Sequence, residues 1–147
     1  MLRLSTKARY ALRAMIELSV RQGQGLVQLR EVAEAQNLSI KYLEQLTISL
    51  RHAGLVRAER GPQGGYQLSK SAEQITALEI VQAVEGPLHL IDCLVQDGAC
   101  DRTGACAAHG LWRKLNGVIG KLLVETTLAS LRDEQRALAE PLASYQI

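Results

Sequence analysis

Apolar residues recur three and four positions apart along much of the chain, which is the spacing of one face of a helix. One such face lies near the N-terminus, and Leu43, Leu46 and Leu50 form another. Gly23 and Gly25 interrupt the pattern between them. The periodicity predicts a mainly α-helical chain, with helices over residues 5–20, 29–36, 40–52 and 77–84.

Residues that start and stop helices stand at the predicted ends. Ser5 or Thr6 can cap the first helix and Ser39 the third, because a side-chain oxygen accepts a free amide group of the first turn. Gly54 follows the third helix, where a residue in the left-handed conformation commonly ends one. Only residues 37–39 separate the second and third helices, which is the pattern of a helix-turn-helix.

Two short segments of alternating polar and apolar residues follow this pair of helices. Residues 55–60 read Leu-Val-Arg-Ala-Glu-Arg, and residues 66–68 read Tyr-Gln-Leu. Residues 61–65, Gly-Pro-Gln-Gly-Gly, lie between them and have the composition of a turn. These segments predict a β-hairpin, and a helix-turn-helix followed by a β-hairpin is a winged helix.

The longest predicted helix runs from near Cys106 to about Thr126. Its apolar residues recur at alternating four- and three-residue steps, at Leu111, Leu115, Val118 and Leu122, with Ile119 and Leu123 beside them. Such a stripe requires another apolar surface. A second copy of the helix is the simplest one, and the chain's own winged domain is the alternative. A short final helix is expected over residues 128–138, with a loose tail after Pro141.

The net charge of +2 conceals an uneven distribution along the chain. Residues 1–70 hold 11 Lys and Arg against 5 Asp and Glu, a net charge of +6, whereas residues 71–147 hold 6 against 10, a net charge of −4. A basic half favours a polyanionic partner through its summed field. We therefore predict a winged helix-turn-helix DNA-binding domain over residues 1–70. Residues 71–147 would form a linker helix, a cysteine loop and a long C-terminal dimerisation helix.

Composition narrows the class of protein further. No apolar run approaches the length of about 20 residues that spans a bilayer, and the basic N-terminus lacks the apolar segment of a signal peptide. Unpaired cysteines then indicate the reducing cytoplasm. No nucleotide-binding glycine motif follows a strand, and the cysteines are the only candidate nucleophiles. We therefore expect neither an enzyme nor a protein with a small-molecule substrate.

The three cysteines of the chain lie in one segment together with a histidine. Cys93, Cys100 and Cys106 are followed by His109, three residues after the last cysteine. Thiolates and an imidazole are ligands for zinc or for an iron–sulfur cluster. An odd number of cysteines argues against a purely structural disulfide scheme. The residues themselves leave open an iron–sulfur cluster, a zinc site with three cysteines and one histidine, and a redox thiol switch without metal.

Several segments resemble a known family over nearly the whole chain. Residues 3–11 (Arg-Leu-Ser-Thr-Lys-Ala-Arg-Tyr-Ala), 42–46 (Tyr-Leu-Glu-Gln-Leu) and 60–66 (Arg-Gly-Pro-Gln-Gly-Gly-Tyr) resemble the Rrf2 family of winged-helix repressors. The cysteine segment and the His-Gly-Leu-Trp of residues 109–112 resemble its IscR-like branch of iron–sulfur cluster regulators.

The resemblance implies a 2Fe–2S cluster with the ligands Cys93, Cys100, Cys106 and His109. The first two cysteines lie one residue further apart than is usual in the family, which a loop can absorb. In the NsrR branch an N-terminal carboxylate helps to bind a 4Fe–4S cluster. The matching residue here is Arg9, which cannot ligate a cationic iron, so the IscR-like type is favoured.

A helix-turn-helix of this kind places the N-terminal part of its second helix in the major groove of double-stranded DNA. A dimer would read a palindromic operator, one half-site for each subunit. Glu44 can accept a hydrogen bond from cytosine N4 and so select or veto bases, and Arg60 can enter a narrow minor groove. The candidate DNA-binding residues are Lys7, Arg9, Ser39, Lys41, Tyr42, Glu44, Arg60 and Gly61.

These observations predict a cytoplasmic, homodimeric DNA-binding transcriptional regulator that senses iron–sulfur cluster or redox status through a bound 2Fe–2S cluster. The alternative within the same class is a cluster-free regulator that uses thiols or zinc. The alternative from another class is a small iron–sulfur electron-transfer protein.

Overall fold

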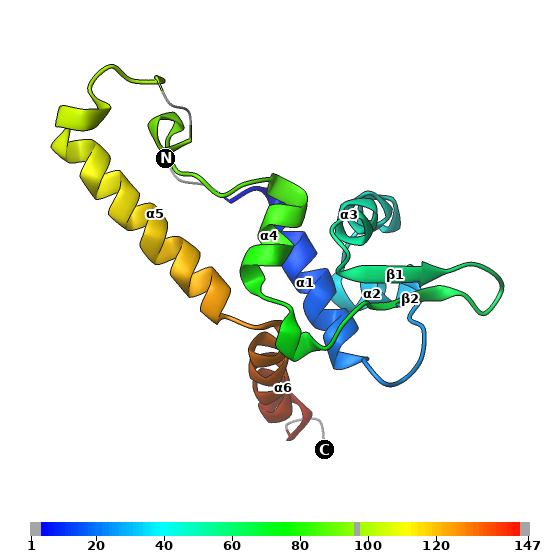
Figure 1. The fold of residues 1–147 in the computed structure, drawn as a ribbon. Coiled ribbons are helices and arrows are strands. Elements are labelled where there is room, and N and C mark those ends of the chain that lie inside the picture. Colours follow the sequence, from blue (N-terminus) through cyan, green and yellow to red (C-terminus); the bar gives the residue numbers. More distant parts are fainter. Residues whose placement is uncertain (1–3, 96–97, 145–147) are drawn as a thin grey trace.

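The computed structural model describes residues 4–95 and 98–144, the side chains of 141–144 excepted. It shows a mainly helical chain with one small sheet (Figure 1). The helices are α1 (Thr6–Val20), α2 (Leu29–Gln36), α3 (Ile40–His52), α4 (Ala77–Glu85), α5 (Ala107–Glu125) and α6 (Leu128–Ser144), and the strands are β1 (Val56–Glu59) and β2 (Gly65–Leu68). Short 3-10 turns lie at η1 (Ala72–Gln74), η2 (Asp92–Leu94) and η3 (Thr103–Ala105). The predicted winged helix-turn-helix is confirmed.

Local signals set the ends of the first three helices. The Ser5 Oγ accepts a hydrogen bond from the Lys7 backbone N–H at 3.1 Å, and the Ser39 Oγ accepts one from the Tyr42 N–H at 3.4 Å. Gly54 has a φ of 75°, the left-handed conformation that ends α3 at little steric cost. The predicted caps of α1 and α3 are confirmed, because each depends on residues within one helical turn.

The wing is an antiparallel hairpin in which Val56 pairs with Leu68 and Glu59 with Gly65. The outer edge of β2 pairs with Val27 through two backbone hydrogen bonds to Tyr66, of 2.7 and 2.9 Å. A Cβ atom at Gly65 would lie 2.7 Å from the Val27 carbonyl oxygen, so only glycine permits this approach. The glycine-rich turn thus brings the hairpin against the segment between α1 and α2.

The hydrophobic core surrounds α1, which packs against α2, α3, α4 and α6. Met15, Leu43 and Leu50 are fully buried there. Residues from the second half of the chain complete the same core, namely Ala72, Ile75, Ile80, Leu128 and Ala129. The two parts of the chain, residues 1–70 and 71–147, therefore share one hydrophobic core. Their division into a DNA-binding part and a sensing and dimerisation part stays a prediction.

Helix α5 projects away from this core, as Figure 1 shows, and none of its residues is buried. Its predicted stripe lies open, with relative exposures of 57% for Leu111, 40% for Leu115, 65% for Val118 and 63% for Leu122. Ile119 and Leu123 are instead half-buried and face the chain's own residues 85–90. The apolar residues of α5 therefore form an exposed face and a half-buried face, and Leu122 borders both.

The prediction for the last helix is wrong in its extent. Helix α6 runs to Ser144, beyond the expected end at Leu138, and Pro141 lies within it. A proline removes one backbone donor and crowds the preceding turn, but here it does not end the helix. The predicted loose tail after Pro141 thus begins as helix. No helix of the described residues is both long enough and apolar enough to cross a membrane.

A capping box stabilises the start of α4. The Thr76 Oγ1 accepts a hydrogen bond from the Glu79 N–H, and Glu79 Oε2 accepts one from the Thr76 N–H at 2.8 Å. Lys70 Nζ lies 2.8 Å from Glu79 Oε1. Partial burial raises the pKa of Glu79, but the hydrogen bonds from Lys70 and Thr76 outweigh it, so its pKa lies below the usual range.

Replacing Thr76 with alanine should lower the free energy of unfolding by about 1 kcal/mol, the usual cost of losing a cap. Urea denaturation measures this loss of stability, and Ser69→Ala, at an exposed serine, should change the free energy of unfolding little.

Because the pKa of Glu79 is lowered in the folded state, the contribution of Glu79 to stability is present above its unfolded pKa and is lost as the pH falls through the folded value. The stability difference between wild type and Glu79→Gln should therefore shrink in acid.

Candidate nucleic-acid interface and metal centre

Helix α3 presents a mainly polar outer face, interrupted by the exposed Ile40 and Ile48. Leu43, Leu46 and Leu50 are buried against the core, as their spacing predicts. Lys41 and Glu44 lie on the opposite, exposed side, near the N-terminus of the helix. Ser39 is exposed as well, and its hydroxyl already caps the helix. The first turn of α3 is thus accessible to a large partner.

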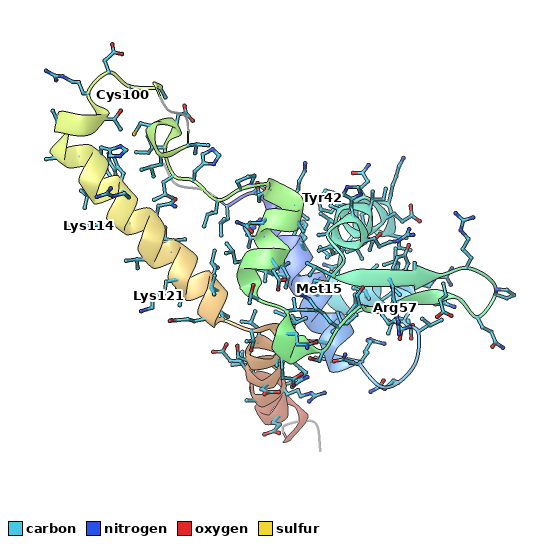
Figure 2. All side chains as sticks on the ribbon, in the orientation of Figure 1. Met15, Tyr42, Arg57, Cys100, Lys114 and Lys121 are labelled. Atoms are coloured by element: carbon cyan, nitrogen blue, oxygen red, sulfur yellow. The ribbon has the colours of Figure 1, made fainter. Side chains whose placement is uncertain are left out.

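Tyr42 differs from the other candidates because its ring is half-buried. It packs edge-to-face on Tyr10 of α1, with ring centroids 5.7 Å apart and planes at 88°. The Arg13 guanidinium lies 5.5 Å from the Tyr10 ring centre, and its Nε donates to the side-chain oxygen of Gln36 at 3.1 Å. Tyr42 therefore also holds the start of α3 in place against α1 (Figure 2).

The basic residues at the start of α1 are accessible too. Lys7 and Arg9 are exposed on its first two turns. The Ser5 N–H donates to Glu85 Oε1 at 3.1 Å, and the Ser5 hydroxyl contacts the same oxygen. This contact ties the first turn of α1 to the end of α4.

The wing tip is exposed at Arg60 and Gly61, and the hairpin extends away from the helices in Figure 1. Gly61 has a φ of 117°, which disfavours any other residue at the turn. Further back on the hairpin, the Gln67 amide faces Arg57. When its oxygen is placed toward the guanidinium, the orientation that satisfies both groups, that oxygen lies 3.0 Å from Arg57 Nε and 3.2 Å from Arg57 Nη2. This cross-strand contact orients the Arg57 guanidinium on the outer face of the sheet.

An open hollow of about 520 Å³ lies between the C-terminal half of α3 and strand β1. Its sides combine cationic and aliphatic groups, and they are formed by Ile48, Arg51, His52, Val56, Arg57 and Ala58. None of these residues is among the DNA-binding candidates that the sequence predicts. Arg51 and His52, the two basic residues at the end of α3, could have indicated such a surface from the sequence. Only the fold brings β1 alongside them.

The three cysteines are free thiols in a loop that leads into α5. Cys93 lies in η2, which contacts α5, and Cys106 is the residue before the first turn of α5. Both are half-buried, whereas Cys100 is exposed between them. Within the described residues no three His, Cys, Asp or Glu side chains are close enough to hold a metal ion. The fold thus gathers the cysteines into one region without a formed site.

His109 lies on the face of α5 that is turned toward the chain. Its Nδ1 is buried and has no hydrogen-bond partner among the described residues. Such an unpaired buried polar atom costs about 1–3 kcal/mol unless a ligand or water satisfies it. An unpaired imidazole nitrogen on the helix that follows a loop with three free thiols has the donor chemistry of an iron–sulfur or zinc ligand. The residues present therefore fit such a group.

The described hydrogen bonds of the cysteine loop are all local. The Leu94 N–H donates to Ile91, and the Thr103 N–H and hydroxyl both donate to Cys100. Neither η2 nor η3 contains a buried residue. Just before the loop, the Leu90 N–H donates to the side chain of Asn116 on α5 at 3.2 Å. The loop can consequently rearrange around a ligand without breaking core contacts.

Comparison with known proteins gives concordant results. A model of the Rrf2 family, described as iron-dependent transcriptional regulators, matches residues 4–134. The transcriptional regulator IscR of Cronobacter sakazakii is 39% identical over 137 residues, 93% of this chain and 84% of the relative. The structure of CymR, the global cysteine regulator of B. subtilis, superposes with a TM-score of 0.78 at 38% identity and covers 91% of this chain and 98% of that chain. The structure of T. potens IscR gives a TM-score of 0.74 at 35% identity, with 91% and 88% covered.

Proposed function

This chain belongs to the Rrf2 family of transcriptional regulators, and from that premise we propose that it senses iron–sulfur cluster or redox status while bound to DNA as a homodimer. The proposal rests on the buried Nδ1 of His109, which has no hydrogen-bond partner among the described residues and lies beside a loop with three free thiols. That combination is what a fourth ligand of an iron–sulfur cluster requires.

Cys93, Cys100, Cys106 and His109 would hold a 2Fe–2S cluster. When bound, the cluster supplies a centre whose oxidation state or loss reports on oxidants and on iron–sulfur supply. Three thiolates give most of the donation, and the neutral imidazole removes one negative charge from the site. Cys100 is exposed, whereas Cys93 and Cys106 are half-buried, so the Cys100 thiol is the ligand that the loop would have to bring inward.

The DNA-binding surface would combine α3, the wing and the start of α1. Lys41, Ser39 and Glu44 would meet the major groove, and Arg60 with Gly61 the minor groove. Lys7 and Arg9 would contact phosphates, and Tyr42 would position α3 as well as contact DNA. Two copies joined through α5 would place two such surfaces on a palindromic operator.

Anaerobic purification tests the cofactor directly. The full-length protein should be red-brown, with visible absorption bands and iron and acid-labile sulfide in equal amounts. A colourless protein that contains neither iron nor sulfide would contradict the proposal.

A cluster-free thiol regulator is the second candidate, and the three free thiols of the cysteine loop favour it. In that case Cys93, Cys100 and Cys106 would respond to oxidants by forming disulfides, and no iron would be needed. Colour separates the two candidates, and a zinc assay on the colourless protein separates the zinc form from the thiol form.

Arg60 is the wing residue with the clearest expected contribution. Because an exposed arginine at a hairpin tip can enter a narrow minor groove, Arg60→Ala should weaken binding by about 1–3 kcal/mol. Fluorescence anisotropy with an operator duplex measures the loss. Gln63→Ala, at an uncharged residue of the same turn, is the control and should cost less. Equal affinities for wild type and Arg60→Ala at every salt concentration would show that the wing does not contact DNA.

A further inference from the structure

We propose that a pocket at the base of the wing binds a small organic monocarboxylate. The pocket measures about 250 Å³ and lies between the end of α1, the segment that leads to α2, and both strands of the hairpin. None of its lining residues belongs to the cysteine loop or to the predicted DNA-binding residues, so the inference goes beyond the proposed function. This wing-base pocket is lined by three cations and three buried aliphatic residues, namely Arg21, Arg57, Lys70, Leu18, Val27 and Leu68, together with polar and glycine residues.

The ion pairs around the wing-base pocket leave one positive charge unbalanced. Arg21 Nε lies 2.7 Å from Glu17 Oε1, and Lys70 Nζ lies 2.8 Å from Glu79 Oε1. Arg57 forms no ion pair with a carboxylate of the described residues. A ligand head with a single negative charge therefore suits the pocket better than a dianion, which would meet the carboxylates behind the other two cations.

The cations of the pocket also keep hydrogen-bond donors free. When the Gln67 oxygen is placed toward the guanidinium, it engages Nε and Nη2 of Arg57, and Nη1 has no partner among the described residues. The Lys70 ammonium carries three N–H donors and uses one on Glu79. A carboxylate has two oxygens that accept such donors, and bonds of this charge-assisted kind are the strong ones.

Two glycines of the segment after α1 add backbone donors to the same pocket. Gly23 and Gly25 both line it, and their φ angles of 89° and 91° lie in the left-handed region. Within residues 4–95 and 98–144 neither N–H group has an acceptor. Turns with left-handed residues form concavities of backbone N–H groups that bind anions. The segment thus offers neutral donors opposite the cationic side chains.

The aliphatic residues of the pocket suit a short hydrocarbon chain on the ligand. Leu18, Val27 and Leu68 belong to the hydrophobic core and are only 3%, 5% and 6% exposed. Each lines the pocket with the small part of its surface that the core leaves uncovered. At about 30 Å³ for each water-sized group, the volume holds about eight non-hydrogen atoms. A carboxylate with a chain of a few methylene groups is of this size.

A ligand in this place would join the end of α1 to the wing. The segment between α1 and α2 runs along the hairpin (Figure 1), where Val27 and Tyr66 exchange backbone hydrogen bonds of 2.7 and 2.9 Å. An occupant that contacts Arg57 on β1, Lys70 after β2 and the glycines after α1 adds bonds between the same segments. Because these contacts exist only in the folded chain, the ligand should raise the Tm.

Calorimetric titration of the full-length protein with sodium pentanoate tests the site, and pentanamide is the neutral probe of the same shape. Pentanoate should bind and raise the Tm, whereas pentanamide should do neither. Arg57→Gln should weaken pentanoate binding about 10- to 100-fold, the value of a hydrogen bond to a charged group. Gln22→Glu, which adds a carboxylate to the lining, should weaken it as well. Gln24→Glu, in the same exposed turn but outside the lining, and Arg30→Gln on α2 are the controls and should bind like wild type.

A series of probes from acetate to pentanoate tests the aliphatic part of the pocket. Affinity should rise about fourfold for each added methylene group, the usual gain from burying one. Absence of pentanoate binding to the folded wild type, or equal binding to wild type and Arg57→Gln, would overturn the inference. Inorganic phosphate that binds more tightly than pentanoate and is lost in Arg57→Gln would overturn the assignment of a monocarboxylate. These outcomes leave the proposed function intact, because iron and sulfide content tests that function separately.

Discussion

Replacing His109 with alanine should give a protein that folds and dimerises but loses its cluster within one purification. The Nδ1 of its imidazole is buried and finds no partner within residues 4–95 and 98–140, and three cysteines leave an iron–sulfur cluster one protein ligand short. Removing it should not harm the fold, because α5 has no buried residue. Iron and sulfide content and the visible spectrum measure the loss, and circular dichroism reports on the helices.

Two further substitutions make this result specific. His109→Cys should retain a cluster and lower its reduction potential, since a thiolate donates more charge than an imidazole. His89→Ala, at an exposed histidine four residues before Cys93, should leave cluster content unchanged. Alanine at any of the three cysteines should cost more than alanine at His109, because thiolates dominate the bonding. Full cluster occupancy with an unaltered spectrum in His109→Ala would place the fourth ligand elsewhere.

Val118→Glu should convert the dimer into a monomer and abolish tight binding to a palindromic site. Val118 is 65% exposed at the centre of an uncovered stripe formed with Leu111, Leu115 and Leu122. Each such side chain contributes about 1.5–3 kcal/mol when fully buried against a partner. A carboxylate from each copy would have to enter the same apolar contact without a counter-charge, which costs more than the lost valine. Sedimentation equilibrium measures the association.

Val124→Glu is the matched control on the same helix. Val124 is also exposed, at 49%, but lies about 120° around the helix from Val118. The Val124→Glu protein should sediment like wild type and bind DNA normally, because the new carboxylate remains in water. A Val118→Glu protein that still sediments as a dimer would show that the stripe is covered in some other way. Unchanged helix content in both variants excludes misfolding as the cause of dissociation.

The ends of the elements in the first half of the chain could be predicted from sequence because their causes are local. Helices α2 and α3 begin and end where the periodicity, Ser39 and Gly54 indicate. The hairpin follows from alternation interrupted by glycine and proline, with strand ends shifted by one residue. The apolar stripe of α5 also follows from spacing alone, although its exposure does not. Caps, turns and periodicity act over a few residues, so the chain specifies them without its partners.

The final helix shows where local signals mislead. Pro141 predicts an end, yet α6 continues to Ser144. The start of α6 is fixed from a distance, because Leu128 enters the central core and its N–H donates to the Ile75 carbonyl at 2.8 Å. An isolated antiparallel β-bridge between Thr76 and Thr127 joins the same two segments. Residues more than fifty positions apart determine where α5 stops and α6 begins.

The sequence by itself determined the elements, the winged helix-turn-helix and the residue types of a cysteine and histidine site. Only the tertiary structure decided which apolar residues of α5 are half-buried, that Tyr42 packs on Tyr10, and that Arg51 and Arg57 line one hollow. The physical reason is the range of the forces involved. Hydrogen bonding within a turn acts between near neighbours in the chain, whereas burial and charge complementarity depend on side chains that meet only after folding.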